Sequence, residues 1–311
     1  MNAVRMLIAW VLTLLGVALG PAGAWQDPQP FIGVTYTERA ASSPRPIRMH
    51  VAQIDLTAPG IRFKVSAPGG DREVVRQTTL DFARQERAQL AINGHFFLPF
   101  PSDDKTAWVI GLAASEGKVF SAFETPAQNY ALVDFAPALN IDRDNRASIV
   151  TGDPVADPTR VREAVSLWNV VAGSSQIVTN GAVSVPEYRD DNHSSGKLTP
   201  GGPANYSNLK AWADVATART AIGLSRDQRT LTLFTVDVRG GSEGMRLSEV
   251  AAVLIRDFAV FNALNLDGGG STTMVMEGAN GAPAIVNVPS DGSAGRSVAT
   301  SLAVFAQRRE R

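Results

Sequence analysis

The sequence contains no cysteine among its 311 residues, which excludes disulfides and thiolate metal sites. Histidine is scarce as well: His50, His95 and His193 are too widely spaced to predict a histidine-based zinc site. The formal net charge is only −1, so no global electrostatic field indicates nucleic acid or a membrane surface as a partner. Hydrophobic residues make up 44% of the chain, which suits one large domain or two modest ones.

Beyond residue 24 the sequence has no long apolar run, so we expect no stable membrane insertion of the mature chain. Before it, Arg5 precedes an apolar run over residues 6–20, and Ala22-Gly23-Ala24 provides the small residues of a cleavage site. We therefore expect residues 1–24 to be a signal peptide, because an uncleaved anchor would need a longer run. Export without disulfides favours a bacterial protein that is periplasmic or secreted.

Hydrophobic patterning predicts mainly strands, together with two helices. Thr78 and Asp81 have the spacing of a helix cap, with a helix to about residue 87. Apolar residues at helical spacing predict a second helix over residues 247–259. Asn180-Gly181 predicts a hairpin turn. Strands are expected over residues 46–56, 60–66, 90–97, 109–114, 130–135, 147–151, 167–172, 176–185, 220–224, 230–238 and 263–266.

The C-terminal third indicates the fold class. Strand 230–238, helix 247–259 and strand 263–266 have the lengths of a βαβ unit, which predicts that the two strands are parallel. Asp237 and Asp267 would then meet at the carboxyl edge of the sheet, where α/β proteins bind ligands. We therefore expect an α/β protein with a mixed β-sheet, βαβ units and helices packed on the sheet.

Two strand endings resemble each other. "LAING" at residues 90–94 and "LNLDG" at residues 264–268 are both apolar segments that end in Asx-Gly. An internal duplication would place Asn93 and Asp267 in equivalent positions. Coincidence is the alternative, because this strand ending is common.

The stretch "LNLDGGGSTT" over residues 264–273 carries the strongest chemical signal. Three glycines allow the backbone to approach a ligand, and the hydroxyl residues after them can bind sugar or phosphate oxygens. Residue types alone leave two interpretations open: a ligand site with one carboxylate, Asp267, or a tight turn that Asp267 caps. A nucleotide P-loop is not favoured, because Gly-Lys-Ser/Thr is missing. Residues 186–208 form the longest segment without periodicity, and we expect this loop to cover the site.

Three motifs in order, "AINGHFF" (91–97), "ARTAIGL" (218–224) and "VFNALNLDGGGSTTMVM" (260–276), give the chain a family resemblance. It is similar to the phosphodiester glycosidase family, whose bacterial members are often described as exopolysaccharide-biosynthesis proteins. The resemblance implies a glycosidase-like domain over residues 88–307, with residues 25–87 as weakly matching N-terminal strands and helix of the same domain. It implies hydrolysis of a sugar-1-phosphodiester in an envelope or extracellular glycan, with a carbohydrate or glycosyl phosphate as substrate.

Within that resemblance, carboxylates are the catalytic candidates. Asp267 is the candidate nucleophile or general base at the anomeric centre. Asp237 is its candidate partner, as acid/base or metal ligand, unless it only ends a strand. Glu249 is a third candidate, although carboxylates are favoured in the first turn of any helix.

The substrate-binding candidates follow the same motifs. Arg219 is the first candidate for the phosphate, because its planar fork suits two oxygens, and Arg296 in "RSVATSLAVF" is the second. Asn93 could bind sugar hydroxyls or orient Asp267, or it could make a turn with Gly94. His95 stands where the family usually has glycine, and it is either a general acid or a satisfied buried residue. The other candidates are Thr220, Gly268, Gly269, Gly270, Ser271 and Thr272.

No cofactor is required by these patterns, although Asp237, Asp267 and nearby carbonyls could hold Ca²⁺ or Mg²⁺. A non-catalytic carbohydrate-binding or exopolysaccharide-assembly protein on the same fold is the alternative, since fold does not fix function. A hydrolase with Ser271 as nucleophile is a third option, which the missing G-x-S-x-G motif weakens.

Overall fold

The computed structural model describes residues 29–123, 136–153, 157, 159–185, 213 and 215–309. Among these residues, 43% lie in strands and 10% in helices. Every strand pair described is antiparallel. The predicted α/β class with helix-packed βαβ units is therefore wrong: the protein is built mainly from antiparallel sheets.

The largest sheet, here the first sheet, has seven strands in the order β1-β2-β17-β16-β18-β14-β15. The second sheet has five, in the order β20-β19-β6-β22-β3. The strands of the first sheet are β1 Val34–Ala41, β2 Ile47–Asp55, β17 Thr230–Val236, β16 Arg219–Ser225, β18 Val260–Asn265, β14 Ser175–Thr179 and β15 Ala182–Val183. Those of the second are β20 Pro283–Ile285, β19 Met274–Glu277, β6 Leu90–Asn93, β22 Ser301–Phe305 and β3 Arg62–Val65.

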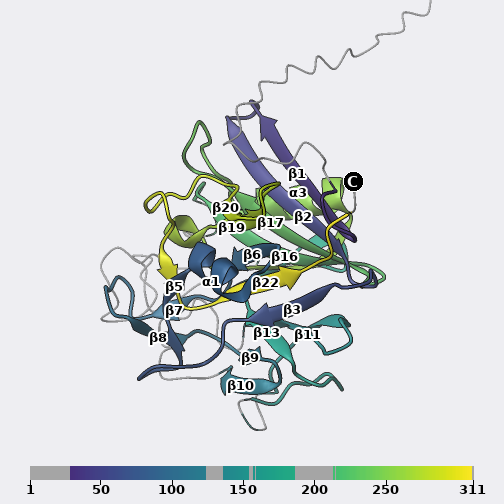
Figure 1. The fold of residues 1–311 in the computed structure, drawn as a ribbon. Coiled ribbons are helices and arrows are strands. Elements are labelled where there is room, and N and C mark those ends of the chain that lie inside the picture. The colour runs from purple at the N-terminus through teal and green to yellow at the C-terminus, as the bar shows by residue number, and fades with distance from the viewer. Residues whose placement is uncertain are drawn as a thin grey trace, which may run out of the picture.

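The main hydrophobic core lies between these two sheets. It joins residues such as Ile222 and Leu264 of the first sheet to Ile92 and Leu302 of the second. Helix α3 (Leu247–Phe258) covers the outer face of the first sheet, and α1 (Thr79–Glu86) covers that of the second, where Figure 1 shows it against β6 and β22. Both helices therefore lie outside the inter-sheet core.

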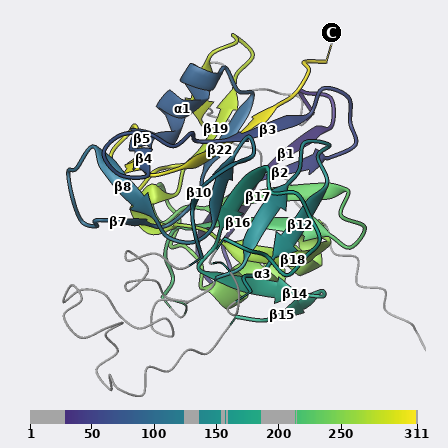
Figure 2. The same ribbon diagram turned by 90° about the horizontal axis from the view of Figure 1, so that it is seen from below.

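Further strands lie next to β3, below it in Figure 1, and Figure 2 views them from below. A five-stranded sheet contributes Leu139, Ile141 and Val171 to the main core. Its strands, in order, are β10 Lys118–Ser121, β9 Ala113–Ser115, β13 Asn169–Ala172, β11 Ala138–Ile141 and β12 Ala147–Val150. One small sheet pairs β21 Ser297–Val298 with β5 Gln77–Thr78. The other has three strands, in the order β4 Val74–Val75, β8 Thr106–Val109 and β7 Phe97–Leu98.

The expected βαβ unit is replaced by a crossover that skips one strand. Strands β17 and β18 are both antiparallel to β16, so they run in the same direction with β16 between them. The reason is local: β16 and β17 are consecutive and form a hairpin, and β16 then occupies the position beside β18. The equal direction still brings Asp237 and Asp267, which follow the two strands, to one end of the sheet.

Several local predictions are confirmed. Thr78 caps α1 by accepting a hydrogen bond from the Asp81 amide, and Asn180-Gly181 forms the β14–β15 turn with positive φ at both residues. Strand β1 was not predicted, because most of its residues are half-buried or exposed and give no apolar alternation. The expected strand 130–135, the loop 186–208 and residues 1–24 lie outside the described residues. Within the described ranges, no helix has the length and apolar character needed to cross a membrane.

Candidate active site

The site lies where strands of the two main sheets end against each other. Asn93 ends β6 of the second sheet, and Asp267 follows β18 of the first by two residues. The Asp267 amide donates to the Gly94 carbonyl at 3.0 Å, and the Asn93 side-chain amide donates to the Asp267 carbonyl at 2.6 Å. The two Asx-Gly endings singled out in the sequence therefore meet directly.

Asn93 makes the central contacts between these two strand ends. Its Oδ1 accepts hydrogen bonds from the Thr220 hydroxyl at 2.9 Å and the Thr273 amide at 3.0 Å. Asn93, Thr220 and Thr272 are almost wholly buried. Their contacts hold the backbone on both sides of the glycine-rich turn.

The three glycines each meet a different demand of the turn that contains η2 (Gly269–Ser271). Gly269 has a φ of +58° and donates its amide to the Ala218 carbonyl at 2.8 Å. A Cβ on Gly268 would lie 2.9 Å from that same carbonyl, and one on Gly270 would lie 2.6 Å from Cζ of Arg296. The turn is thus packed closely against the start of β16 and against one guanidinium group.

The Asp267 carboxyl group lies in this turn with only 9% of the residue exposed. Burial raises its pKa to about 7, although the hydroxyl of Ser271, the charge of Arg296 and the amide of Gly268 each lower it. At neutral pH the carboxyl is therefore present in both its protonated and ionised forms. That is the property required of a group that gives or takes a proton.

Arg296 places a cation next to this carboxyl. Its Nε donates to Asp291 Oδ2 at 2.7 Å, its Nη1 lies 3.5 Å from the Ser271 hydroxyl, and its side chain is 22% exposed. The guanidinium stacks on Phe100 at 4.6 Å. Burial lowers the pKa of Arg76, and the nearby charge of Arg296 lowers it further. Arg76 was not predicted as part of the site.

Arg219 and Thr220 point to opposite faces of the first sheet, as neighbours on a strand must. Thr220 faces Asn93 between the sheets. Arg219 is fully buried on the α3 side, where it donates to the carbonyls of Met245 at 3.1 Å and Val215 at 2.5 Å. Burial lowers the pKa of Arg219 to about 10.

Asp237 lies at the same end of the first sheet and is fully buried. Its Oδ1 accepts from the Asn287 side chain at 3.1 Å and the Val288 amide at 3.0 Å, and its Oδ2 lies 3.2 Å from His50 Nε2. Neither His50 nor Asn287 was predicted as part of the site. The only signal for His50 was a histidine within a predicted strand, and Asn287 had none.

The two other titratable candidates have structural partners. Glu249 lies in the first turn of α3, accepts the Arg246 amide at 2.7 Å and pairs with Arg45. The His95 ring is fully buried, with Nδ1 2.7 Å from the Thr300 hydroxyl and Nε2 near backbone groups. Burial lowers the pKa of His95 to about 4, so the ring is neutral. Gly94 packs beside it, since a Cβ there would lie 2.7 Å from Thr300 Oγ1.

Comparison with known proteins gives the family. A family model described as phosphodiester glycosidase matches residues 86–305. The chain belongs to the phosphodiester glycosidase family. It is 30% identical over 240 residues to mouse N-acetylglucosamine-1-phosphodiester alpha-N-acetylglucosaminidase, covering 74% of this chain and 39% of the mouse protein. The bovine enzyme of the same name is 28% identical over 224 residues, covering 72% of this chain and 37% of the bovine protein.

A solved structure supports the fold. The zebrafish N-acetylglucosamine-1-phosphodiester alpha-N-acetylglucosaminidase catalytic domain, described as auto-inhibited by its pro-peptide, matches with a TM-score of 0.61 and 22% identity. The match covers 92% of this chain and 87% of that domain. The chain spans about two fifths of the length of the two curated relatives, at 39% and 37%. The family match begins at residue 86, so β1 and β2 of this phosphodiester glycosidase precede it.

The described part of this phosphodiester glycosidase does not form a set of metal ligands. In those residues, no three His, Cys, Asp or Glu side chains gather as a metal-binding group. Both Asp237 oxygens already have protein partners. Binding of Ca²⁺ or Mg²⁺ by Asp237, Asp267 and nearby carbonyls therefore stays a prediction.

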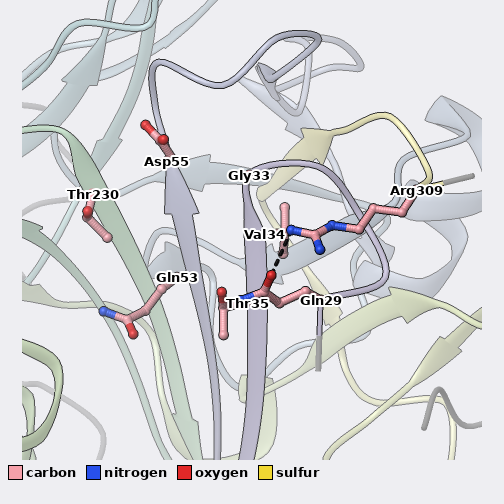
Figure 3. A pocket seen from close by; sticks show the side chains of 8 residues that line it. All are labelled: Gln29, Gly33, Val34, Thr35, Gln53, Asp55, Thr230 and Arg309. Carbon is pink, nitrogen blue, oxygen red and sulfur yellow. Dashed lines mark hydrogen bonds between the residues drawn. The ribbon is translucent and has the colours of Figure 1, made fainter. Parts of the chain in front are cut away.

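Two surface pockets lie away from Asp267. One, of about 300 Å³, is lined by Asp55, Thr230 and Arg309 among others, and Arg309 bonds Gln29 at its rim (Figure 3). Asp55 ends β2 and Thr230 begins β17, so this pocket is at the opposite end of the sheet from Asp237. The other, of about 420 Å³, adjoins Phe305 at the corresponding far end of β22. Neither pocket is part of the candidate site.

Proposed function

We propose that this phosphodiester glycosidase is an exported hydrolase that cleaves a sugar-1-phosphodiester bond in an envelope or extracellular glycan, with Asp267 as its main catalytic carboxylate. The observation that carries the proposal is the Asp267 carboxyl group, buried beside Ser271 and Arg296 with a pKa of about 7. Residues 1–24 support the exported state, because they have the pattern of a signal peptide.

The proposed hydrolysis does not require a general acid to protonate the leaving group fully. Cleavage on the sugar side of the bridging oxygen expels a phosphate monoester, whose second pKa is about 6, so it leaves without full protonation. The anomeric carbon needs either a nucleophile or an activated water. Ionised Asp267 can serve as either. As a general base it takes the proton of the water whose oxygen bonds the anomeric carbon, while the electron pair of the broken C–O bond leaves with the phosphate.

We assign the phosphate to Arg296 in preference to Arg219. Arg296 is partly exposed, next to Ser271 and close enough to Asp267 to lower its pKa. A planar guanidinium binds two phosphate oxygens well and would offset the charge that develops on the leaving group. Arg219 instead holds the start of β16 through backbone carbonyls on the far face of the sheet.

Two other candidates have roles that follow from their contacts. Asn93 orients the Asp267 backbone, and Glu249 stabilises the start of α3. Asp237 has no direct contact with Asp267 among the described contacts, so we do not assign it the acid/base step. Gly268, Gly269 and Gly270 shape the turn that presents the carboxyl group and the Ser271 hydroxyl.

The test is an activity screen of the purified protein over sugar-1-phosphodiesters, followed by phosphorus and proton NMR. We expect a phosphate monoester and a free sugar, with the first anomer formed showing whether configuration is retained. Asp267→Asn should be inactive, and Asp227→Asn, which changes an exposed turn carboxylate, should retain full activity. Samples with EDTA, Ca²⁺ or Mg²⁺ test metal dependence. Glycan binding without turnover by the wild type would refute the proposal and support the non-catalytic carbohydrate-binding alternative.

A further inference from the structure

The hairpin formed by β1 and β2 lies before the family match, yet it contributes to the interior beneath the active-site turn. His50 of β2 pairs in register with Thr235 of β17, and both face the inter-sheet core. His50 is 1% exposed, with its Nε2 3.2 Å from Asp237 and its Nδ1 2.8 Å from the Tyr36 hydroxyl of β1. A histidine from the N-terminal hairpin is therefore the hydrogen-bond partner of Asp237 Oδ2.

The other side of Asp237 leads to the turn. The Asn287 side-chain amide donates both to Asp237 Oδ1 and to the Thr272 carbonyl, each at 3.1 Å. Its Oδ1 accepts the Met274 amide at 2.7 Å. Asn287 therefore hydrogen-bonds the backbone on both sides of Thr273. This segment directly follows Ser271, whose hydroxyl bonds Asp267.

The hydrogen bonds of this chain converge on the Asp237 carboxylate from both sides. The Tyr36 phenol is protonated, since burial and the charges of Glu38 and Asp237 raise its pKa. With the Tyr36 O–H as donor to Nδ1 of His50, Nε2 carries the ring proton that is donated to Asp237. Asp237 then accepts from His50, Asn287 and Val288, which satisfies a carboxylate that is fully removed from water.

We infer that His50 is a positioning residue for the catalytic turn, acting through Asp237 and Asn287 on the Thr272–Met274 segment. The inference rests on the proposed function for its effect on catalysis. The described hydrogen-bond partners of His50 are Tyr36 and Asp237, so it acts on the reacting groups only through other residues. Its effect is on geometry, and a displacement of about 1 Å in a reacting group can cost about a hundredfold in rate.

Three variants test this inference. His50→Leu removes the donor to Asp237, and we expect kcat to fall by about ten- to a hundredfold with KM nearly unchanged. His50→Gln keeps an amide N–H near the position of Nε2 and should restore most of kcat. Thr235→Val is the matched control, because it changes the register partner of His50 and removes a buried hydroxyl that has no hydrogen-bond partner in the described structure. It should leave kcat unchanged.

Amide hydrogen exchange gives a second readout that needs no activity. The Val288 amide donates to Asp237 and the Met274 amide to Asn287, so both should exchange faster in His50→Leu and not in Thr235→Val. If His50→Leu does not fold, Tyr36→Phe, which loses only a hydroxyl group, should show smaller changes in the same direction. Unchanged exchange at both amides would overturn the inference.

The two proposals fail in distinguishable ways. A wild type that hydrolyses no sugar-1-phosphodiester refutes the proposed function, and amide exchange alone then decides whether His50 controls the turn. An active wild type combined with a His50→Leu variant of normal kcat, measured well below its melting temperature, shows a role in stability alone and refutes the positioning of catalysis.

Discussion

Replacing Asp267 by asparagine should separate activity from stability. The burial that raises the pKa of this carboxyl group from 3.8 to about 7 also makes its ionised form unfavourable in the folded protein. At 1.36 kcal/mol per pKa unit, the difference corresponds to about 4 kcal/mol of folding free energy. Asparagine is nearly isosteric and carries no charge, so it should relieve this cost while removing the proposed nucleophile or base.

The sign of the pH dependence follows from proton binding. The folded protein holds the Asp267 proton more tightly than the unfolded chain, so the contribution of this group to stability is present below about pH 4 and lost as pH rises to about 7. Asp267→Asn does not titrate there. Its melting temperature should therefore exceed that of the wild type increasingly between pH 4 and 7, by an upper bound on the order of ten degrees at pH 8.

Calorimetry at pH 4.5, 6 and 8, together with kcat at pH 8, tests both halves of this prediction. The expected loss of kcat is at least about a hundredfold. Asp227→Asn, in an exposed turn, serves as the control for a general charge effect. Near-normal kcat, or a loss of activity that follows a collapsed melting temperature, would show that the turn is only structural. Loss of activity without stabilisation at pH 8 would refute the burial argument.

Four further predictions concern the same turn and its neighbours. The wild-type kcat/KM should rise with pH through about 7, and Ser271→Ala should move this rise to higher pH in a pH–rate profile, because the Ser271 hydrogen bond lowers the pKa of Asp267. Gly270→Ala should raise KM about tenfold in steady-state assays, since a Cβ would lie 2.6 Å from Cζ of Arg296 and displace its guanidinium. Arg296→Lys keeps the charge but loses the fork, and should raise KM severalfold more than it lowers kcat. Arg219→Lys should instead lower the melting temperature, by the equivalent of about 1–3 kcal/mol of unfolding free energy, with KM nearly unchanged.

Local sequence signals predicted local structure well. The cap at Thr78, the Asn180-Gly181 turn and helix α3 each depend on interactions within a few residues, so their patterns are visible in the sequence. The strand order could not be read in the same way. In the structure, β16 lies between β17 and β18. The hydrophobic pattern of each strand would be the same if β17 and β18 were parallel neighbours, so the pattern could not distinguish the two arrangements.

The site itself was only partly predictable. Alternation along a strand could have shown that Arg219 and Thr220 point to opposite faces, so that only one of them could contribute between the sheets. Contact of Asn93 with Asp267 was among the interpretations, and the structure places its side chain on the Asp267 carbonyl. The link from His50 to Asp237 joins residues 187 positions apart, and no local pattern encodes such a distance.

The reciprocal hydrogen bonds between the Asn93-Gly94 ending and Asp267 give this architecture a particular failure mode. Each partner belongs to a different sheet, so neither sheet contains the proposed active site by itself. A partly unfolded state that kept both sheets intact but separated them would retain most strand hydrogen bonding and lose all activity. Turnover would then report the docking of the sheets more sensitively than far-UV circular dichroism, which reports secondary structure.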